Sequence, residues 1–367
     1  MERSCHWGIP ASFSACFLKT SEYLAQTVAS TIPFPGRARS TPRFDWRSAG
    51  LRYYAYGFHL KSLHGEKVWR VSVDGGFTCP NVDGRVAVGG CTFCDNRSFS
   101  PSRRVRRDDV AAQIDRGIAA LQRRYGVTAG KYTAYFQPGT NTYGRIDKLR
   151  ELFETAAAHP QIIALAIGTR PDCVEDEVLD LLAELARRLP VSVEYGMQTM
   201  HDSSLRAMNR GHDHQSTIDA VERSRGRGFE ICLHLLIGWP TESRDDVMAS
   251  AREVARLDVD SVKLHNLYAV DGTALSEQVR AGEVRLLDRD TYVSWVADIL
   301  EELPPRVVVE RLSAHAPPEY LTGPAWCLDG AAIRRDIELE LARRGSWQGR
   351  RYGCREGGGL ARSGQGG

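Results

Sequence analysis

Three cysteines lie in a glycine-rich stretch that reads Asp74-Gly75-Gly76-Phe77-Thr78-Cys79-Pro80 and, after nine residues, Gly90-Cys91-Thr92-Phe93-Cys94. A β-rich run at 68–73 leads directly into this stretch, which is therefore expected to be the loop at the end of a strand. Glycines let such a loop fold tightly enough for three sulfurs to converge. Three thiolates suit a soft metal or an iron–sulfur cluster, and a set of three leaves one metal position open.

The cysteines by themselves leave two kinds of metal site open. One is a zinc site in which His59 or His64 supplies the fourth ligand, and the other is an iron–sulfur cluster. Coincidence of three cysteines in one loop is a third interpretation. The spacing does not decide between them, and the decision rests on later segments.

Length and composition bound the class of protein. The chain has 367 residues, 42% of them hydrophobic and 26% charged, as is typical of a globular protein with one large core or two smaller ones. No run approaches the roughly 18 apolar residues that cross a bilayer, and no signal peptide is recognisable. Outside the loop, the cysteines are scattered, which favours a reducing compartment over a disulfide scaffold. We therefore expect a cytoplasmic protein without a membrane partner.

Positive charge is concentrated towards the two ends of the chain. The net charge is +2, whereas residues 1–50 carry +3 (six basic against three acidic) and residues 334–367 carry +4 (eight against four). The ends either contact a polyanion or are solvated, arginine-rich segments.

Six β-rich runs alternate with helical patterns from residue 68 onwards. This alternation predicts right-handed βαβ units and a parallel sheet. No GxGxxG follows the first strand, so a dinucleotide-binding fold has no local support. The expected fold is α/β, a partial (β/α)6 barrel similar to a TIM barrel. The predicted strands are 68–73, 131–136, 162–167, 191–195, 231–237 and 261–267, and the predicted helices are 108–125, 146–158, 176–188, 214–225 and 244–257.

Composition divides the chain into four predicted parts. Residues 1–48 mix Ser, Thr, Pro and Arg without periodicity and are expected to be a low-order extension. Residues 49–305 form the core domain, and 306–350 form a C-terminal α/β extension with a strand-like run at 307–310. The Gly-rich tail, 351–367, is expected to be disordered.

Polar motifs follow the predicted strands where each strand ends. In parallel α/β folds the reactive site lies at the carboxyl ends of the strands. Four such ends in register with a three-cysteine loop predict one shared site. The motifs are Gln137-Pro138-Gly139-Thr140 after the second strand, Arg170-Pro171-Asp172-Cys173 after the third, Gln198 and Arg210 after the fourth, and His234 to Pro240 on the fifth.

The cysteines, the strand rhythm and the strand-end motifs together resemble the radical S-adenosylmethionine (SAM) superfamily. They are most similar to the branch that contains the catalytic subunit of the elongator complex and the YhcC-like proteins. The resemblance covers about 53–326. Eleven residues separate Cys79 from Cys91, more than in the usual CxxxCxxC motif, and this longer gap is itself typical of the elongator-like branch.

The resemblance implies a radical SAM barrel with two cofactors. Cys79, Cys91 and Cys94 would hold a 4Fe-4S cluster, and SAM would chelate the fourth iron through its amino and carboxylate groups. Electrons would come from an external donor of flavodoxin or ferredoxin type. Reductive cleavage of SAM would then release a 5′-deoxyadenosyl radical, while the protein positions SAM and excludes water.

Further residues are assigned by position within the family's motifs. Gln137, Gly139 and Thr140 correspond to the segment that meets the SAM amino group. Gln198 and Arg210 correspond to residues that contact the ribose and the carboxylate, and a guanidinium suits a carboxylate because it binds it in bidentate fashion. The remaining SAM contacts implied by the resemblance are Phe93, which would shield the cluster, and His234 and Leu236, which would line the adenosine.

Arg170 and Cys173 are the predicted catalytic residues. Arg170 would position SAM or substrate, and the Cys173 thiol would donate a hydrogen atom or bind an intermediate, although a buried cysteine is more often plain core. Lys263, His265 and Tyr268 end the sixth strand and are candidates for substrate contact.

The resemblance implies modification of a tRNA base, the wobble uridine, as the function. Basic residues that would bind RNA are Arg103, Arg104, Arg106 and Arg107 after the cysteine loop, and Arg343, Arg344, Arg350 and Arg351 near the end. Two alternatives stay open at this point. One is a radical SAM oxidoreductase acting on a small molecule such as a tetrapyrrole precursor, and the other is a non-catalytic, zinc-binding RNA-interaction protein.

Overall fold

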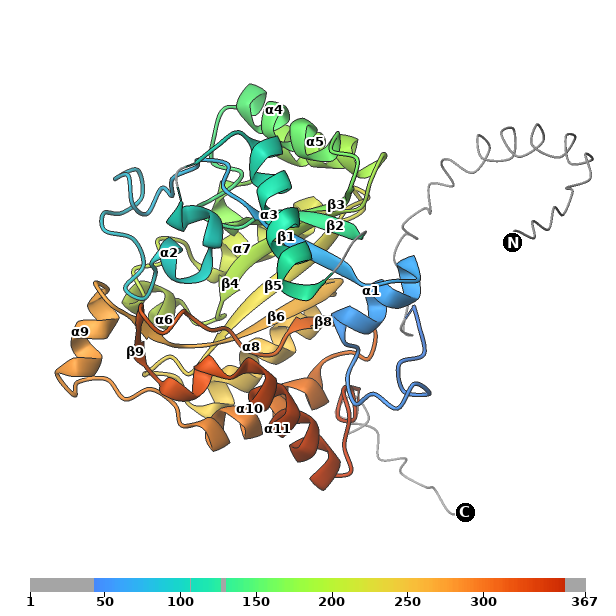
Figure 1. Cartoon of the computed structure of the whole chain (residues 1–367). Coiled ribbons are helices and arrows are strands. Elements are labelled where there is room, and N and C mark those ends of the chain that lie inside the picture. Colours follow the sequence, from blue (N-terminus) through green and yellow to red (C-terminus); the bar gives the residue numbers. More distant parts are fainter. Residues whose placement is uncertain (1–42, 106, 127–129, 354–367) are drawn as a thin grey trace, which may run out of the picture. The chain divides into compact units, whose positions relative to one another are not determined.

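Seven parallel strands form one curled sheet in the computed structural model, which describes residues 43–105, 107–126 and 130–353 (Figure 1). The strand order is β1-β2-β3-β4-β5-β6-β8, so the first six strands lie side by side in the order in which they occur along the chain. The six predicted strands are confirmed, and the run predicted at 307–310 joins them as a seventh. The bounds are β1 Val68–Val73, β2 Lys131–Phe136, β3 Ile162–Thr169, β4 Val191–Gln198, β5 Glu230–Ile237, β6 Ser261–Asn266 and β8 Val308–Arg311.

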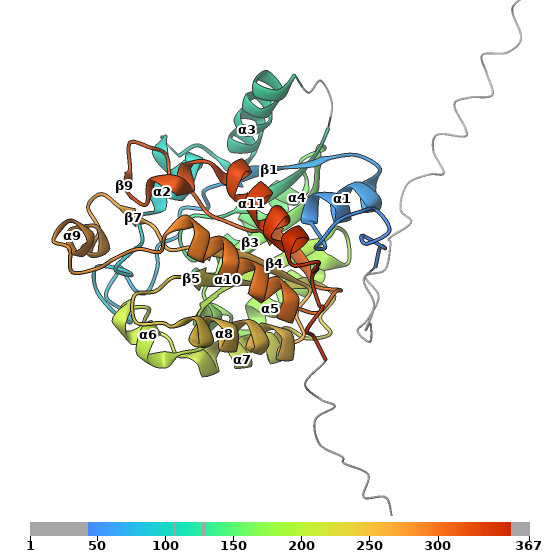
Figure 2. The same ribbon diagram turned by 90° about the horizontal axis from the view of Figure 1, so that it is seen from below.

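Long helices connect the strands and cover the outer face of the sheet (Figures 1 and 2). Their ends follow from local chemistry: Asp109 caps α3, Gly126 ends it in the left-handed conformation, and Ser243 with Asp246 forms a capping box on α8. The five predicted helices are confirmed within three residues. The helices are α3 Val110–Tyr125, α4 Ile146–Ala157, α5 Asp176–Ala186, α7 His214–Ser224, α8 Arg244–Arg256, α10 Arg289–Glu302 and α11 Gly330–Arg343.

Several short elements have no counterpart in the predicted series, because each is too short to show a hydrophobic period. The two strands among them pair in an antiparallel ribbon apart from the main sheet. These elements are α1 Tyr56–His64, α2 Asn96–Phe99, α6 Asp202–Ala207, α9 Ala274–Arg280, β7 Ala269–Val270, β9 Leu321–Gly323, and 3₁₀ turns at Pro101–Arg104, Pro171–Cys173 and Ala325–Leu328.

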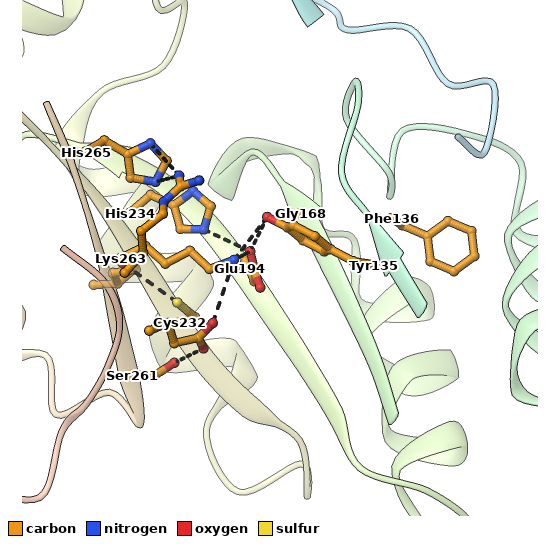
Figure 3. Close-up of polar contacts among 12 residues, drawn as sticks. Tyr135, Phe136, Gly168, Glu194, Cys232, His234, Ser261, Lys263 and His265 are labelled. Atoms are coloured by element: carbon orange, nitrogen blue, oxygen red, sulfur yellow. Dashed lines mark hydrogen bonds and ion pairs between the residues drawn. The ribbon is translucent and has the colours of Figure 1, made fainter. Parts of the chain in front are cut away.

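The two faces of the sheet differ in chemistry, because successive side chains of a strand point to opposite faces. On β2, Tyr132, Ala134 and Phe136 are fully buried in the core beneath the helices. Tyr135 points to the other, inner face, and Figure 3 shows its ring directed away from that of Phe136. The inner face carries charged and polar side chains, so the concave side of the sheet is the place for a polar site.

The predicted boundaries at 48/49, 305/306 and 350/351 stay predictions. Trp46, on the amino-terminal side of the first boundary, is fully buried and donates its indole N–H to the Pro305 carbonyl at 3.0 Å. The expectations for residues 1–42 and 354–367, including Cys5, Cys16 and Cys354, lie outside the described residues. Among the residues that are described, no helix has both the length and the apolar character to cross a membrane.

Candidate active site

The cysteine loop lies at the carboxyl end of β1, over the ends of the neighbouring strands. Backbone hydrogen bonds fix its second half on both sides. The Thr92 N–H donates to the Met208 carbonyl at 3.0 Å, and the Thr92 carbonyl accepts from the Leu275 N–H at 2.9 Å. Segments that follow β4 and β7 therefore hold Cys91 and Cys94 in place.

Side-chain N–H groups approach two of the three sulfurs. Asn81 Nδ2 and Arg210 Nη1 each lie 3.6 Å from Cys91 Sγ, and Arg170 Nη1 lies 3.9 Å from Cys79 Sγ. Asn81 is fully buried and also donates to the Asn209 carbonyl. Side-chain N–H groups at this distance can donate hydrogen bonds to the sulfurs of an iron–sulfur cluster.

The three cysteines are close enough to influence one another. Although Cys94 is exposed as a residue, desolvation of its sulfur raises the pKa of the thiol, with the nearby Cys91 and Cys79 sulfurs adding to the effect and Arg210 opposing it. Cys91 is buried, Cys79 half-buried and Cys94 exposed. Three soft ligands with cationic N–H donors beside two of them suit an anionic iron–sulfur cluster. The described residues contain no group of three or more His, Cys, Asp or Glu arranged to hold a single metal ion.

The two histidines considered as zinc ligands belong to α1, which precedes β1. His59 is buried and its Nδ1 contacts the Tyr54 hydroxyl at 2.8 Å. The His64 carbonyl accepts from Nζ of Lys131, the first residue of β2. His64 thus lies at the amino ends of the strands, opposite the cysteines, and is not positioned as their fourth ligand.

Hydrogen bonds connect the loop after β2 to the cysteine loop. The Thr140 N–H donates to the Thr78 carbonyl at 3.0 Å, and the Gly139 N–H donates to Asn96 Oδ1 at 3.1 Å. Gly139 has φ +77°, and a Cβ there would lie 2.5 Å from the Phe77 carbonyl oxygen. Only glycine therefore fits this approach. Gln137, half-buried, begins the same loop.

Gln198 and Arg210 come together at Gly196 on β4. The Gly196 carbonyl accepts from Arg210 Nη2 at 3.0 Å, and a Cβ on Gly196 would lie 2.5 Å from that nitrogen and 2.7 Å from Gln198 Nε2. Gln198 has φ +70° and follows an irregularity in the pairing with β5. The side chains of Gln198 and Arg210 therefore lie together beside Gly196, and Arg210 also contacts the Cys91 sulfur.

The Arg170 guanidinium forms its hydrogen bonds with other residues of the protein. It is 2% exposed, forms a bidentate ion pair with Asp172 at 2.7 and 2.9 Å, and donates to the Arg210 carbonyl at 2.7 Å. Cys173 follows in a 3₁₀ turn, half-buried, and desolvation together with Asp172 raises its thiol pKa to about 12. These contacts favour a role for Arg170 in positioning other residues of the site. The raised pKa of Cys173 means that its thiol keeps its S–H hydrogen.

Phe93 and Leu236 belong to one apolar cluster at the mouth of the half-barrel. The Phe93 ring meets Trp239 edge-to-face at 6.3 Å between centroids, and Leu236 is buried in the same cluster. His234 lies deeper on β5, where its Nε2 contacts Glu194 Oε2 at 3.0 Å and its ring stacks on His265. Burial is the main cause that lowers the pKa of His234 to about 4.

A charged network inside the half-barrel joins His234 and Lys263, both singled out from the sequence, to Glu194, Glu310 and Arg70, to which no role was assigned. Glu194 is fully buried; its Oε2 accepts from Tyr135 OH at 2.7 Å and contacts Lys263 Nζ, as Figure 3 shows. Glu310 pairs with Arg70 and accepts from Ser261. Desolvation opposes ionisation of Glu194, but Lys263, His234 and Arg70 outweigh it and hold the pKa of this carboxyl well below its ordinary value. The sequence signal for this network is a charged residue, Glu194, within the largely buried strand β4.

Comparison with known proteins identifies the family. The radical SAM superfamily model matches residues 83–254, and the model of the Radical_SAM C-terminal domain matches 259–343. The chain is 39% identical to protein YtqA of Bacillus subtilis over 307 residues, covering 84% of this chain and 95% of YtqA. It is 36% identical to YhcC of Escherichia coli over 273 residues, covering 74% and 86%.

More distant relatives extend the comparison to proteins with named activities. A structure of Methanocaldococcus infernus Elp3 aligns with a TM-score of 0.57 at 19% identity, covering 77% of this chain and 64% of that one. A tRNA uridine(34) acetyltransferase of Methanocaldococcus jannaschii is 27% identical over 176 residues, 47% of this chain and 31% of the relative. The heme chaperone HemW of Mycobacterium tuberculosis is 25% identical over 266 residues, 71% and 63%.

Proposed function

Because the chain belongs to the radical SAM superfamily, within the family of YtqA and YhcC, we propose that it modifies a base of tRNA by radical chemistry, with the wobble uridine as the target. Enzymes of this superfamily use a 4Fe-4S cluster and SAM, and this chain is a radical SAM enzyme. When bound, the cluster supplies the electron that cleaves SAM to a 5′-deoxyadenosyl radical. The protein's share is to hold, orient and shield the reactants.

The proposal gives each predicted residue a role that agrees with its surroundings. Cys79, Cys91 and Cys94 hold the cluster. Gln137, Gly139 and Thr140 bind the SAM amino group beside the cysteine loop, while Gln198 and Arg210 bind the ribose and carboxylate. His234 and Leu236 line the adenosine, and Phe93 shields the cluster. Arg170 positions Arg210 and the loop, and Cys173 donates a hydrogen atom.

The observation that carries the tRNA assignment is the relation to the tRNA uridine(34) acetyltransferases, with which the chain shares 176 aligned residues. A surface feature beside the cysteine loop agrees with RNA binding. Arg104 and Arg97 lie over the Tyr320 ring, at 5.5 and 6.0 Å from its centroid. Arginine and aromatic faces of this kind stack on unpaired bases.

Other basic residues give less support. Arg103 pairs with Asp74, whereas Arg343 and Arg344 pair with Glu340. Arg351 pairs with Glu301, and Arg106 lies outside the described residues. Arginines that already have carboxylate partners contribute less to phosphate binding, and Arg97 is one of them through Asp95. The RNA surface is therefore expected around Arg104 and Tyr320.

The test is nucleoside mass spectrometry of total tRNA from cells with and without the gene. We expect one modified uridine to disappear or its precursor to accumulate. Binding of tRNA to the purified protein should weaken as salt rises, since phosphate contacts release counterions. An unchanged nucleoside profile together with salt-independent binding would refute the proposal.

A second candidate is chemistry on a small molecule, favoured by one specific observation. The match to HemW spans 71% of this chain, more than the 47% matched by the tRNA uridine(34) acetyltransferase. A tetrapyrrole or another carboxylate-bearing molecule would then occupy the half-barrel. Tight binding of such a molecule, with no change in tRNA nucleosides, would favour this function over the first.

A further inference from the structure

Arg311 is the last residue of β8, at the carboxyl end of the strand and on the inner face of the sheet. Its backbone pairs with Lys263, whose side chain points into the half-barrel. Arg311 Nη2 lies 2.8 Å from Nδ1 of His265, which is two residues further along the same strand as Lys263. The residue as a whole is half-buried.

The other buried cations of the inner face have carboxylate partners, and Arg311 has none in the described part of the chain. Arg70 and Lys263 are both within ion-pair distance of Glu194 and Glu310. Two cations thus face two carboxylates, which leaves Arg311 in excess. Its Nε is buried without any hydrogen-bond partner among those residues. A buried N–H of a charged group without a partner is costly, and an anion would satisfy it.

The neighbouring histidines do not offset this charge. Burial is the main cause that lowers the pKa of His234 to about 4 and that of His265 well below its ordinary value, and Arg311 adds to both effects. Both rings are therefore neutral near pH 7. A neutral imidazole offers one N–H donor and cannot replace a carboxylate.

Arg311 lies at the same end of the sheet as the cysteine loop. Arg311 is the last residue of β8, and the cysteine loop follows the last residue of β1. The single carboxylate of SAM has its predicted partner in Arg210, on the β4 side. Arg311 lies on the β8 side, and its guanidinium is therefore available to bind a different anion.

We propose that Arg311, assisted by His265, forms an anion subsite inside the half-barrel that binds a phosphate or carboxylate group of the substrate. This inference rests on the proposed radical SAM function and makes its substrate more specific. For tRNA, the group is a phosphate adjoining the target uridine. For a small molecule, it is a carboxylate. A planar guanidinium binds either group through two parallel hydrogen bonds.

The experiment measures binding by calorimetry to the holoenzyme, with cluster reconstituted and SAM bound, at constant ionic strength. The probes are uridine 5′-monophosphate, uridine and propionate. The proteins are wild type, Arg311→Gln, Arg311→Lys and the control Arg280→Gln. Arg280 is exposed on α9 and pairs with Asp271, so this control removes one positive charge elsewhere. Thermal unfolding of each variant verifies that it is folded.

We expect wild type to bind uridine 5′-monophosphate at least tenfold more tightly than uridine, and Arg311→Gln to abolish this difference. Arg311→Lys should retain part of it, and Arg280→Gln all of it. If only propionate binding depends on Arg311, the subsite stands, the anion is a carboxylate and the tRNA function loses support. If no anion binds, or if anion affinity is the same in wild type and in folded Arg311→Gln and Arg311→Lys, the subsite is refuted even where tRNA nucleosides depend on the gene.

Discussion

At the scale of single residues, Asn81 connects the cysteine loop to the segment that carries Arg210. Its amide donates both to the Asn209 carbonyl and towards Cys91 Sγ. A hydrogen bond to a cluster thiolate stabilises the more negative, reduced state. We therefore expect Asn81 to influence the cluster that Cys91 is proposed to hold, without being one of its ligands.

Asn81→Leu is expected to lower the reduction potential of the cluster, because the amide N–H to Cys91 is lost while the bulk is kept. The expected decrease is on the order of 50 mV, close to a tenfold change in a one-electron equilibrium. The measurement is redox titration of the reconstituted protein followed by electron paramagnetic resonance. Asn266→Leu is the control, since Asn266 is equally buried and bonds the Ala314 N–H. Equal potentials for wild type and Asn81→Leu would show that the contact has no electronic effect.

Glu230, the first residue of β5, yields a prediction about pH. Burial and the nearby Asp260 carboxylate raise its pKa to about 8. The folded protein therefore retains a proton that the unfolded chain loses near pH 4.5. The stability contributed by this proton is present at low pH and is lost as pH rises towards 8.

Glu230→Gln should accordingly become more stable relative to wild type between about pH 5 and pH 8, by up to about 1.4 kcal/mol per pH unit, and the difference should level off above that. Urea unfolding of both proteins across this range gives the difference. A constant difference would mean that Glu230 ionises normally in the folded state.

At the scale of elements, the inner network ties together strands that are distant in sequence. Glu194 on β4 contacts Tyr135 on β2, His234 on β5 and Lys263 on β6. These contacts cross the concave face of the sheet. The network therefore helps to fix the curvature that brings the strand ends to one site.

Lys263→Met should destabilise the protein by about 3–5 kcal/mol, because Glu194 is left buried with a weaker set of partners. Adding Glu194→Gln should recover part of this loss, since the unpaired charge is removed. Denaturant unfolding of the two variants and wild type tests both expectations. A loss below about 1 kcal/mol in Lys263→Met would mean that the network does not stabilise the sheet.

Prediction from sequence was most accurate for long periodic elements. The strand at 231–237 and the helix at 244–257 end within one residue of β5 and α8, because nearly continuous apolar runs and amphipathic patterns have few alternatives. Elements such as α6 and α9 contain fewer than two full helical turns of apolar pattern. They are held by tertiary contacts that no local pattern reveals.

The candidate site was predictable where a motif carries its own spacing. The cysteine loop and the strand-end residues Gly139, Gln198 and Arg210 meet as expected. The hydrogen-bond partners of Glu194 on β2, β5 and β6 lie 40 to 69 residues away in sequence, so only the register of the strands reveals them. The position of Arg311 likewise depends on β8, a seventh strand for which the sequence showed only a short β-rich run.

At the scale of the whole molecule, the curled sheet places the cysteine loop at the carboxyl ends of its strands and charged side chains on its inner face, so two regions of different chemistry adjoin. Cys79, Cys91 and Arg210 lie on the side where the family's cofactors are expected. Lys263, His265 and Arg311 lie on the other, where we expect the substrate. The division follows from strand order, since β1 and β8 are the two edges of one sheet.

The most direct test of this account is SAM cleavage by the anaerobically reconstituted, chemically reduced protein. We expect wild type to contain about four irons per chain and to convert SAM to 5′-deoxyadenosine, and Cys91→Ala to lose both cluster and turnover. A folded Cys91→Ala that still produces 5′-deoxyadenosine, or a wild type that contains its cluster and produces none, would contradict the central claim.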